Sequence, residues 1–194
     1  LIDNYLEHAQ VDSVVADDRA SARAMAEHII SLGHKEVSII SGPMDWYSSR
    51  ERSAGFKEAF EMHKIKVPAI YTADETTFES GKLLFAQAIK KGCTAILAVT
   101  DPMALGAMSA AVAAGIRIPE DLSITGFDDI DSAANAIIPL TTISVARSYL
   151  GMSAARLLWA RLDDKDAPRQ RIDITADLVI RSSTGPAKKL QKKG

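Results

Sequence analysis

Apolar residues follow two alternating patterns along most of the chain, helical spacing in one stretch and a short continuous run in the next. The spacing of Met25, Ala26 and Ile29 predicts a helix over residues 20–32 that ends at Gly33. The short stretch 37–40 that follows, β-branched except for Ser38, predicts a strand. The alternation continues with expected helices at 49–63, 79–91 and 101–114 and expected strands at 67–71, 95–99 and 122–125.

Two helix ends carry further signals. The third expected helix has Lys90 and Lys91 in its last turn, where cations suit the helix dipole, and Gly92 as its cap. Asp101 stands at the expected N-cap of the fourth helix, with Pro102 at its first position. Both ends therefore support the helix boundaries drawn from the apolar pattern.

Helices and strands that alternate through short connections are typical of right-handed β-α-β crossovers, which build a parallel sheet covered on both faces. We therefore expect an α/β fold with a doubly wound parallel sheet. The pattern changes after Asp129, where a loop is expected to Pro139 and an extended segment at 141–145. The extended ends at 171–174 and 178–180 need not belong to the same sheet. The same holds for the helix that precedes them, whose apolar stripe is formed by Leu150, Ala154, Leu157, Leu158 and Leu162.

Composition places the chain among globular proteins. It has 194 residues, of which 47% are hydrophobic and 25% charged, and its formal net charge is −2. At about 150 residues per domain this length corresponds to one or two domains. The near-neutral charge argues against nucleic acid as a partner of these residues, because binding a phosphate backbone requires an excess of positive charge.

The termini and the cysteine count bear on location. Four lysines concentrate in the expected disordered tail 185–194, namely Lys188, Lys189, Lys192 and Lys193. The single cysteine, Cys93, excludes an internal disulfide and favours a reducing compartment. No run of roughly 18 apolar residues and no signal-peptide pattern occurs, so we expect a cytoplasmic protein without a membrane partner.

Polar residues that follow the expected strands are the candidates for ligand binding, because the ligand crevice of an open parallel sheet lies beyond the carboxyl ends of its strands. Four groups stand there. They are residues 41–52 after the first strand, Thr72 and Asp74 after the second, Thr100 and Asp101 after the third, and Gly126, Asp128 and Asp129 after the fourth.

Arg52 and Asp128 are the strongest candidates. The pattern places Arg52 in the first turn of its helix, where the dipole disfavours a cation, so another group should hold it there. The donors of a guanidinium and the acceptors of a carboxylate would together suit a polyhydroxylated ligand such as a sugar or a nucleoside. The alternative is an arginine–carboxylate pair that only joins two loops.

Three aromatic residues, Trp46, Tyr47 and Phe78, fall on the same edge of the expected sheet. Flat rings provide area for a sugar face or a base, although scattered aromatic residues more often only seal a rim. A cluster of carboxylates follows the fourth expected strand and is a weak candidate for a Mg²⁺ site, since hard cations bind carboxylate oxygens. Its members are Asp128, Asp129 and Asp131. Adjacent residues on extended backbone point to opposite sides, which argues against a shared ion.

Signatures of catalysis and cofactor binding are absent from the sequence. It has no G-x-G-x-x-G, no G-x-x-x-x-G-K-[ST] and no G-x-S-x-G motif, and its histidines lack metal-binding spacing. We therefore expect neither a cofactor, nor a metal ion, nor enzymatic activity.

A series of short phrases, individually weak but specific in their order and spacing, resembles the effector-binding domain of bacterial LacI/GalR-type transcriptional regulators. The phrases are His28-Ile29-Ile30, Leu32-Gly33-His34, Ser41-Gly42-Pro43, Arg52 with Gly55-Phe56, Thr100-Asp101, Met103-Ala104-Leu105-Gly106, Ile118-Pro119-Glu120-Asp121-Leu122-Ser123, Gly126-Phe127-Asp128-Asp129, Pro139-Leu140-Thr141-Thr142-Ile143 and Arg181-Ser182-Ser183-Thr184. The resemblance covers nearly the whole chain.

The resemblance implies a periplasmic-binding-protein-like (type I) fold of two α/β lobes that are joined by three crossing strands, with the effector between them. The C-terminal lobe would be complete and the N-terminal lobe partial. The implied divisions are 1–16 as a remnant of the N-terminal lobe, 17–145 as the C-terminal lobe, 146–175 as a helix and strand of the N-terminal lobe, and 176–184 as the return to the C-terminal lobe.

The family's effector contacts correspond by resemblance to Arg52 and Asp128, and also to Asp3 and Ser48. The chain departs from the family pattern at three positions near the expected pocket. Thr100 stands where many members have asparagine, Val145 where some have a polar residue, and Thr76 at a position that is often aromatic. The resemblance therefore does not identify the effector.

The same resemblance implies a homodimeric regulator, most often a repressor, in which effector binding changes the angle between the lobes. A helix-turn-helix headpiece that binds operator DNA is expected before Leu1, outside this chain. A periplasmic sugar-binding protein of a transport system is the alternative, since it shares the two-lobed fold. A doubly wound enzyme that uses Asp128 as a catalytic carboxylate is a more distant one.

Overall fold

The computed structural model describes residues 1–3, 11–89 and 92–188. The helical turn with Lys90 and Lys91 and residues 189–194 of the expected tail lie outside these residues. The first part of the tail expected over 185–194 contacts the protein: the N–H of Gly185 donates to the hydroxyl of Ser123 at 3.1 Å, and Lys188 donates to Asp121 at 2.8 Å. The order of elements is β1 (Ser13–Ala16), α1 (Asp18–Ser31), β2 (Val37–Ser41), α2 (Tyr47–Met62), β3 (Ala69–Thr72), α3 (Phe78–Ala88), β4 (Ala95–Ala98), α4 (Asp101–Ala113), β5 (Ser123–Thr125), α5 (Asp131–Ala134), β6 (Thr142–Val145), α6 (Arg147–Asp163), β7 (Arg171–Ile174) and β8 (Ala176–Val179).

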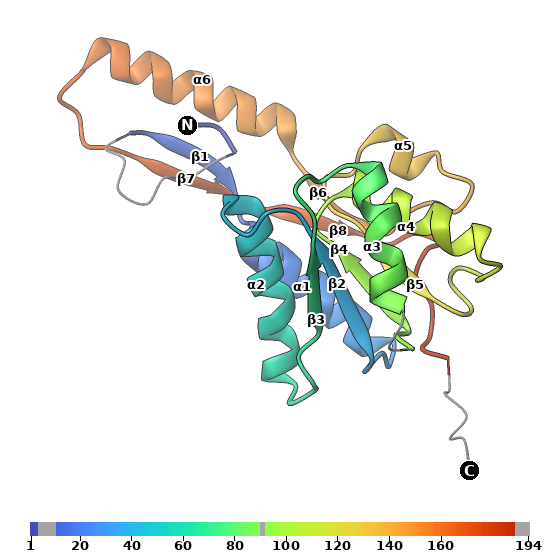
Figure 1. Ribbon diagram of the computed structural model, residues 1–194. Coiled ribbons are helices and arrows are strands. Elements are labelled where there is room, and N and C mark those ends of the chain that lie inside the picture. Colours follow the sequence, from blue (N-terminus) through green and yellow to red (C-terminus); the bar gives the residue numbers. More distant parts are fainter. Residues whose placement is uncertain (4–10, 90–91, 189–194) are drawn as a thin grey trace.

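The main sheet has four parallel strands in the order β3-β2-β4-β5. Helices α1 and α2 lie on one face of this sheet and α3 and α4 on the other (Figure 1). The expected doubly wound α/β fold is therefore confirmed. The chain passes from β2 to β3 on one side and then returns to β4 on the other side of β2. The topological switch point, where such sheets bind ligands, thus lies between β2 and β4.

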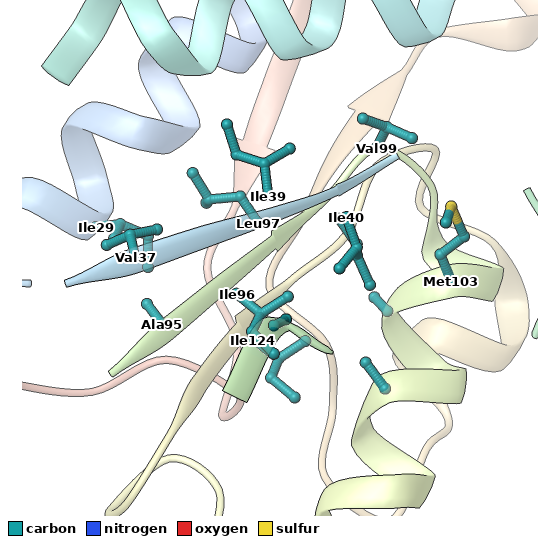
Figure 2. Close-up of a cluster of buried hydrophobic side chains, with 14 of the residues drawn as sticks. Ile29, Val37, Ile39, Ile40, Ala95, Ile96, Leu97, Val99, Met103 and Ile124 are labelled. Atoms are coloured by element: carbon teal, nitrogen blue, oxygen red, sulfur yellow. The ribbon is translucent and has the colours of Figure 1, made fainter. Parts of the chain in front are cut away.

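Both central strands are buried on both faces: β4 is a continuous apolar run, and β2 is apolar except for Ser38 and Ser41, which are also buried. Figure 2 shows Ile39 and Leu97 on one side of the sheet and Ile40 and Ile96 on the other. All four side chains are fully buried. This core fixes the carboxyl ends of β2 and β4 and so provides a firm base for the switch point.

A second, smaller unit is built by β1, β7 and α6. β1 and β7 pair in parallel, and Val14, Leu150 and Ile174 form a separate apolar cluster. In Figure 1 this unit projects away from the main sheet, and the antiparallel pair β6–β8 lies between the two. The expectation that the last helix and the extended ends need not join the main sheet is correct. The stripe on α6 is only partly covered, because Leu158 and Leu162 are each 63% exposed.

Several boundaries differ from the sequence prediction. α2 begins at Tyr47 instead of residue 49, and β3 lies two residues later than expected at its start. Thr100, not Asp101, is the N-cap of α4: its hydroxyl accepts the N–H of Met103, whereas the Asp101 carboxylate turns into the protein. The expected loop to Pro139 contains the short helix α5, which has too few residues for a periodic apolar pattern.

Among the residues that the structure describes, no helix combines the length and apolar composition needed to cross a bilayer.

Candidate functional site

The candidate site lies at the switch point, where the loops after β2, β4 and β5 meet the start of α2. Arg52 is its central residue and is only 4% exposed. Because α2 begins at Tyr47, Arg52 stands in the second turn of the helix, and its expected place in the first turn is wrong. The expectation that another group must hold the cation is nevertheless met by the side chains around it.

The guanidinium of Arg52 is bound on three sides. Its Nε donates to Oδ1 of Asp18 at 2.9 Å, and its Nη1 lies 3.0 Å from Oδ1 of Asp128. The same Nη1 donates to the carbonyl of Val99, directly after β4, at 2.8 Å. The ring of Phe127 lies 3.8 Å from the guanidinium carbon and covers one face of the group. Arg52 and Asp128 are therefore close together, and they form the arginine–carboxylate pair that the sequence analysis gave as the alternative to ligand contact.

Asp18 is a site residue that the sequence reasoning missed. It is the first residue of α1, directly after Asp17, whose side chain caps that helix by accepting the N–H of Ala20. Asp18 is 4% exposed and points to Arg52. The sequence prediction considered residues after four strands, and β1 was not among them. The same rule applied to the apolar run Ser13–Ala16 would have found Asp18.

Burial controls the protonation of the site carboxylates. Desolvation raises the pKa of Asp18 to about 6, and the nearby Arg52 limits that rise. Desolvation likewise raises the pKa of Asp128 to about 6, against the opposing effect of Arg52. Burial alone would lower the pKa of Arg52, but the two carboxylates outweigh it and raise that pKa. Arg52 therefore stays charged while its partners gain protons a little below neutral pH.

Asp101 is a third buried carboxylate beside this group. It is fully buried and accepts the hydroxyl of Thr142 at 2.6 Å and the N–H of Ile130 at 2.9 Å. Desolvation raises its pKa to about 6, although both hydrogen bonds favour the charged form. Its negative charge also disfavours ionisation of Asp128. The site thus contains more carboxylates than guanidiniums, which sets the charge that a ligand would meet.

Three further polar residues, Asp3, Ser48 and Thr100, were expected to contact the effector together with Arg52 and Asp128. Asp3 is exposed, but its charge influences Asp18, Arg52 and Asp128, so it belongs to the same electrostatic cluster. Ser48 is half-buried in the first turn of α2. Thr100 follows β4 and donates to the carbonyl of Thr76 at 3.4 Å. None of these three makes a direct bond to Arg52 in the structure, and their role as effector contacts stays a prediction.

The three aromatic residues lie at the starts of helices on this edge of the sheet. Trp46 is the N-cap position of α2 and is 46% exposed, whereas Phe78 begins α3 and is 40% exposed. Tyr47 is partly buried, and its hydroxyl accepts a hydrogen bond from Arg171 of β7 at 3.3 Å. Tyr47 therefore links the main sheet to the smaller unit, a contact that sequence spacing did not predict.

The neighbouring carboxylates do not gather around a metal position. Asp129 pairs with Arg181 at 2.6 Å, and Asp128 faces Arg52 instead. Within residues 1–3, 11–89 and 92–188, no three histidine, cysteine, aspartate or glutamate side chains are grouped so that they could hold a metal ion. The arrangement can instead bind hydroxyl groups, since the guanidinium donates and the carboxylates accept.

Comparison with known proteins identifies relatives of this chain. A family model described as a periplasmic binding protein-like domain matches residues 26–184. The HTH-type transcriptional repressor PurR of Haemophilus influenzae is 38% identical over 165 residues, which are 81% of this chain and 48% of that protein. The chain thus spans about half the length of the curated relatives that it matches.

Solved structures give the same picture. A dimeric lac repressor with an 11-residue C-terminal deletion is 30% identical, with a TM-score of 0.85, and the match covers 95% of this chain and 68% of that one. A LacI family transcriptional regulator from Enterococcus faecium with bound ribose is 27% identical, with a TM-score of 0.87 over 94% of this chain and 69% of that one.

Proposed function

The chain belongs to the LacI family of transcriptional regulators, as their periplasmic binding protein-like effector domain, and from this premise we propose its function. It is the effector-sensing part of a bacterial DNA-binding repressor. A small molecule binds at the Arg52 site and thereby changes the affinity of the whole protein for operator DNA.

The observation that carries this proposal is the buried Arg52 group at the topological switch point. Burial of a cation between Asp18 and Asp128 carries a large desolvation free energy. This group is also separate from the apolar core that stabilises the sheet. Such a group stands where open α/β sheets bind ligands. Its donors and acceptors are fixed in place before a ligand arrives, which lowers the entropic cost of binding.

The charge of the site favours a neutral effector rich in hydroxyl groups. Asp18, Asp128 and Asp101 outnumber Arg52, so an anionic ligand would meet repulsion, whereas hydroxyl groups can donate to the carboxylates. A sugar is the first choice and a nucleoside-like molecule the second. Ser48, Asp3 and Thr100 would add polar contacts, and Trp46, Tyr47 and Phe78 would provide apolar area beside them.

The response to the effector would be a change in lobe angle. In the lobe division that we propose, 17–145 and 176–184 form one lobe, and 1–16 and 146–175 belong to the other. The chain crosses between them at the end of β1 and in the antiparallel pair β6–β8. An effector that binds one lobe arrangement better than the other shifts the population toward it.

Partners follow from the same proposal. We expect a homodimer, since a dimer of headpieces can bind the two halves of a palindromic operator. The headpiece would be a separate part of the whole protein, outside this 194-residue chain. The site of action would be the cytoplasm, where the operator is.

The relatives favour a regulator over a transport protein, because PurR is a transcriptional repressor and MalR of Streptomyces coelicolor a transcriptional regulator. Neither is an enzyme by its description, so we propose that the chain acts by binding and not by turnover.

The test is selection of DNA sites by the full-length protein from random duplexes, with and without D-ribose, other unphosphorylated sugars and nucleosides. The proposal predicts enrichment of one palindromic sequence, with recovery that changes at least tenfold when the correct sugar is present. Failure to enrich any sequence would contradict a DNA-binding regulator. Enrichment that no sugar or nucleoside alters would contradict the assigned effector class.

A further inference from the structure

The turn that carries Asp128 has an unusual backbone. Asp128 has a φ of 112° and Asp129 a φ of 51°, values that residues other than glycine rarely adopt. A conformation of this kind persists only where the surrounding structure holds it. Part of this support comes from the N–H of Asp128, which donates to the carbonyl of Ile143 at 2.9 Å, and from Arg181, which binds the Asp129 carboxylate.

Arg147 holds the other side of this turn. Its Nη2 donates to the carbonyl of Asp128 and, at 3.0 Å, to the carbonyl of Asp129. One guanidinium thus binds both backbone oxygens of the strained turn. Hydrogen bonds from a charged donor are the stronger kind, so this contact fixes the direction of the Asp128 backbone.

The position of Arg147 in its helix indicates a specific role. It is the first residue of α6, which has no side-chain cap and no acidic residue in its first turn. A cation at a helix N-terminus is disfavoured by the dipole, and nothing in the first turn of α6 compensates for it. The two carbonyls of the Asp128 turn supply the compensation from another part of the fold.

The contact also connects the two units of the structure. Three residues after Arg147, Leu150 packs with Val14 and Ile174 in the cluster of the smaller unit. Asp128 belongs to the loop after β5 of the main sheet and faces Arg52. Arg147 therefore ties the orientation of α6 to the residue at the centre of the candidate site.

We propose that Arg147 is a positioning residue for effector binding: it clamps the Asp128–Asp129 turn to the start of α6, so that Asp128 meets the effector only in the lobe arrangement that makes this contact. The inference rests on the proposed function and adds a residue that neither the sequence nor the resemblance assigned. Through this contact, effector binding at Asp128 would act directly on the start of α6, where the chain crosses between the lobes after β6.

The first experiment needs no ligand. Hydrogen exchange of residues 126–131 is measured by mass spectrometry in the full-length protein, in Arg147→Met and in Arg156→Met. Arg156 is an exposed arginine of the same helix, about 14 Å further along its axis, and serves as the matched control. The clamp predicts exchange at least fivefold faster in Arg147→Met and unchanged in Arg156→Met. Equal rates in all three proteins overturn the proposal.

The second experiment separates positioning from simple stabilisation, with D-ribose as the probe in calorimetry. Arg147 is exposed, so its replacement leaves no cavity in the core. Arg147→Met should bind ribose at least fivefold more weakly at an unchanged Tm, and Arg147→Lys should recover part of the loss. Unchanged affinity in Arg147→Met overturns the positioning role. Faster exchange in Arg147→Met without ribose binding to any of the proteins would exclude ribose as the effector and still support the clamp.

Discussion

At the scale of single residues, the Arg52 site places several charged groups in the protein interior, where the loss of hydration makes a charge unfavourable. The guanidinium of Arg52 pairs with Asp18 and Asp128 and donates a hydrogen bond to the carbonyl of Val99. Desolvation of the carboxylates is only partly offset by Arg52, so their pKa values stay about two units above the usual value.

Removal of Asp18 should reveal its structural share in this group. Asp18→Ala takes one carboxylate from a buried cation, and we expect the free energy of unfolding at pH 7 to fall by about 3 kcal/mol. Asp17→Ala, one position earlier, removes only a helix cap and should cost about 1 kcal/mol. Urea denaturation of both variants measures the difference. Equal losses would show that Asp18 contributes no more than a cap.

Asp101 should make stability depend on pH, in a direction set by its raised pKa. Its pKa is about 6 in the folded protein and 3.8 in a model compound, so its favourable contribution is complete below pH 4 and lost as the pH rises through 6. A shift of two units corresponds to at most about 3 kcal/mol. Asp101→Asn abolishes this titration, so between pH 4 and 7 the variant should gain stability relative to the unsubstituted protein.

The measurement is chemical denaturation of both proteins at pH 4, 5, 6 and 7. The difference between them removes the contributions that both proteins share, including those of His28 and His34, whose pKa values burial lowers and whose effect on stability is therefore opposite in sign. Loss of the Asp101 charge also favours ionisation of Asp128, which acts in the same direction as the loss of the Asp101 titration. A difference that is flat, or that moves in favour of the unsubstituted protein, would refute the assignment.

Residue-level sequence reasoning selected Asp128 because it follows a strand with a clear apolar pattern. It selected Arg52 because a cation near the start of a helix needs a partner, although the structure places Arg52 in the second turn of α2 and not in the first. It missed Asp18, since the short run before it was not treated as a strand. It also placed Asp101 as a cap, because an aspartate before Pro102 has the right local chemistry. The tertiary partner Thr142, 41 residues away, decides the orientation of Asp101, and local spacing contains no information about it.

At the scale of elements, α3 and α4 pack so closely that each presents a glycine at their contact. A Cβ added to Gly106 would lie 1.9 Å from the carbonyl oxygen of Phe78, and one added to Gly81 would lie 2.0 Å from that of Met103. The clashing atoms belong to the backbone, so a rotamer change cannot relieve them. The helical periodicity of both segments was readable from sequence, whereas this close approach was not, because it depends on the partner helix.

Gly106→Ala should therefore destabilise the protein by about 3 kcal/mol, because the two helices must move apart. The matched control is Gly151→Ala in α6, where an added Cβ meets nothing within 4 Å. In the 194-residue chain that variant should be neutral or gain about 0.5–1 kcal/mol, as expected for an exposed helix position. Thermal unfolding of both compares them. Stability losses of the same size would contradict the packing described for α3 and α4.

At the scale of the whole molecule, two packed units are joined by few segments. The main sheet has a large apolar core, whereas the unit of β1, β7 and α6 has three core residues and an exposed Leu158 and Leu162. The alternation of helices and strands predicted the first unit well, because each element there packs against its neighbours in sequence. The second unit joins β1 to β7, whose partners are more than 150 residues apart, and no periodic pattern encodes that pairing.

The central claim is that the Arg52 group binds a sugar-like effector, and calorimetric titration of the full-length protein with D-ribose and other unphosphorylated sugars tests it most directly. Arg52→Ala should weaken the affinity for the best ligand at least tenfold. Arg52→Lys keeps the charge but loses the fork of donors, and should also bind more weakly while it remains folded. Arg19→Met, which removes an exposed arginine from α1, should bind as the unsubstituted protein does. Unchanged affinity in folded Arg52→Ala and Arg52→Lys would contradict the account.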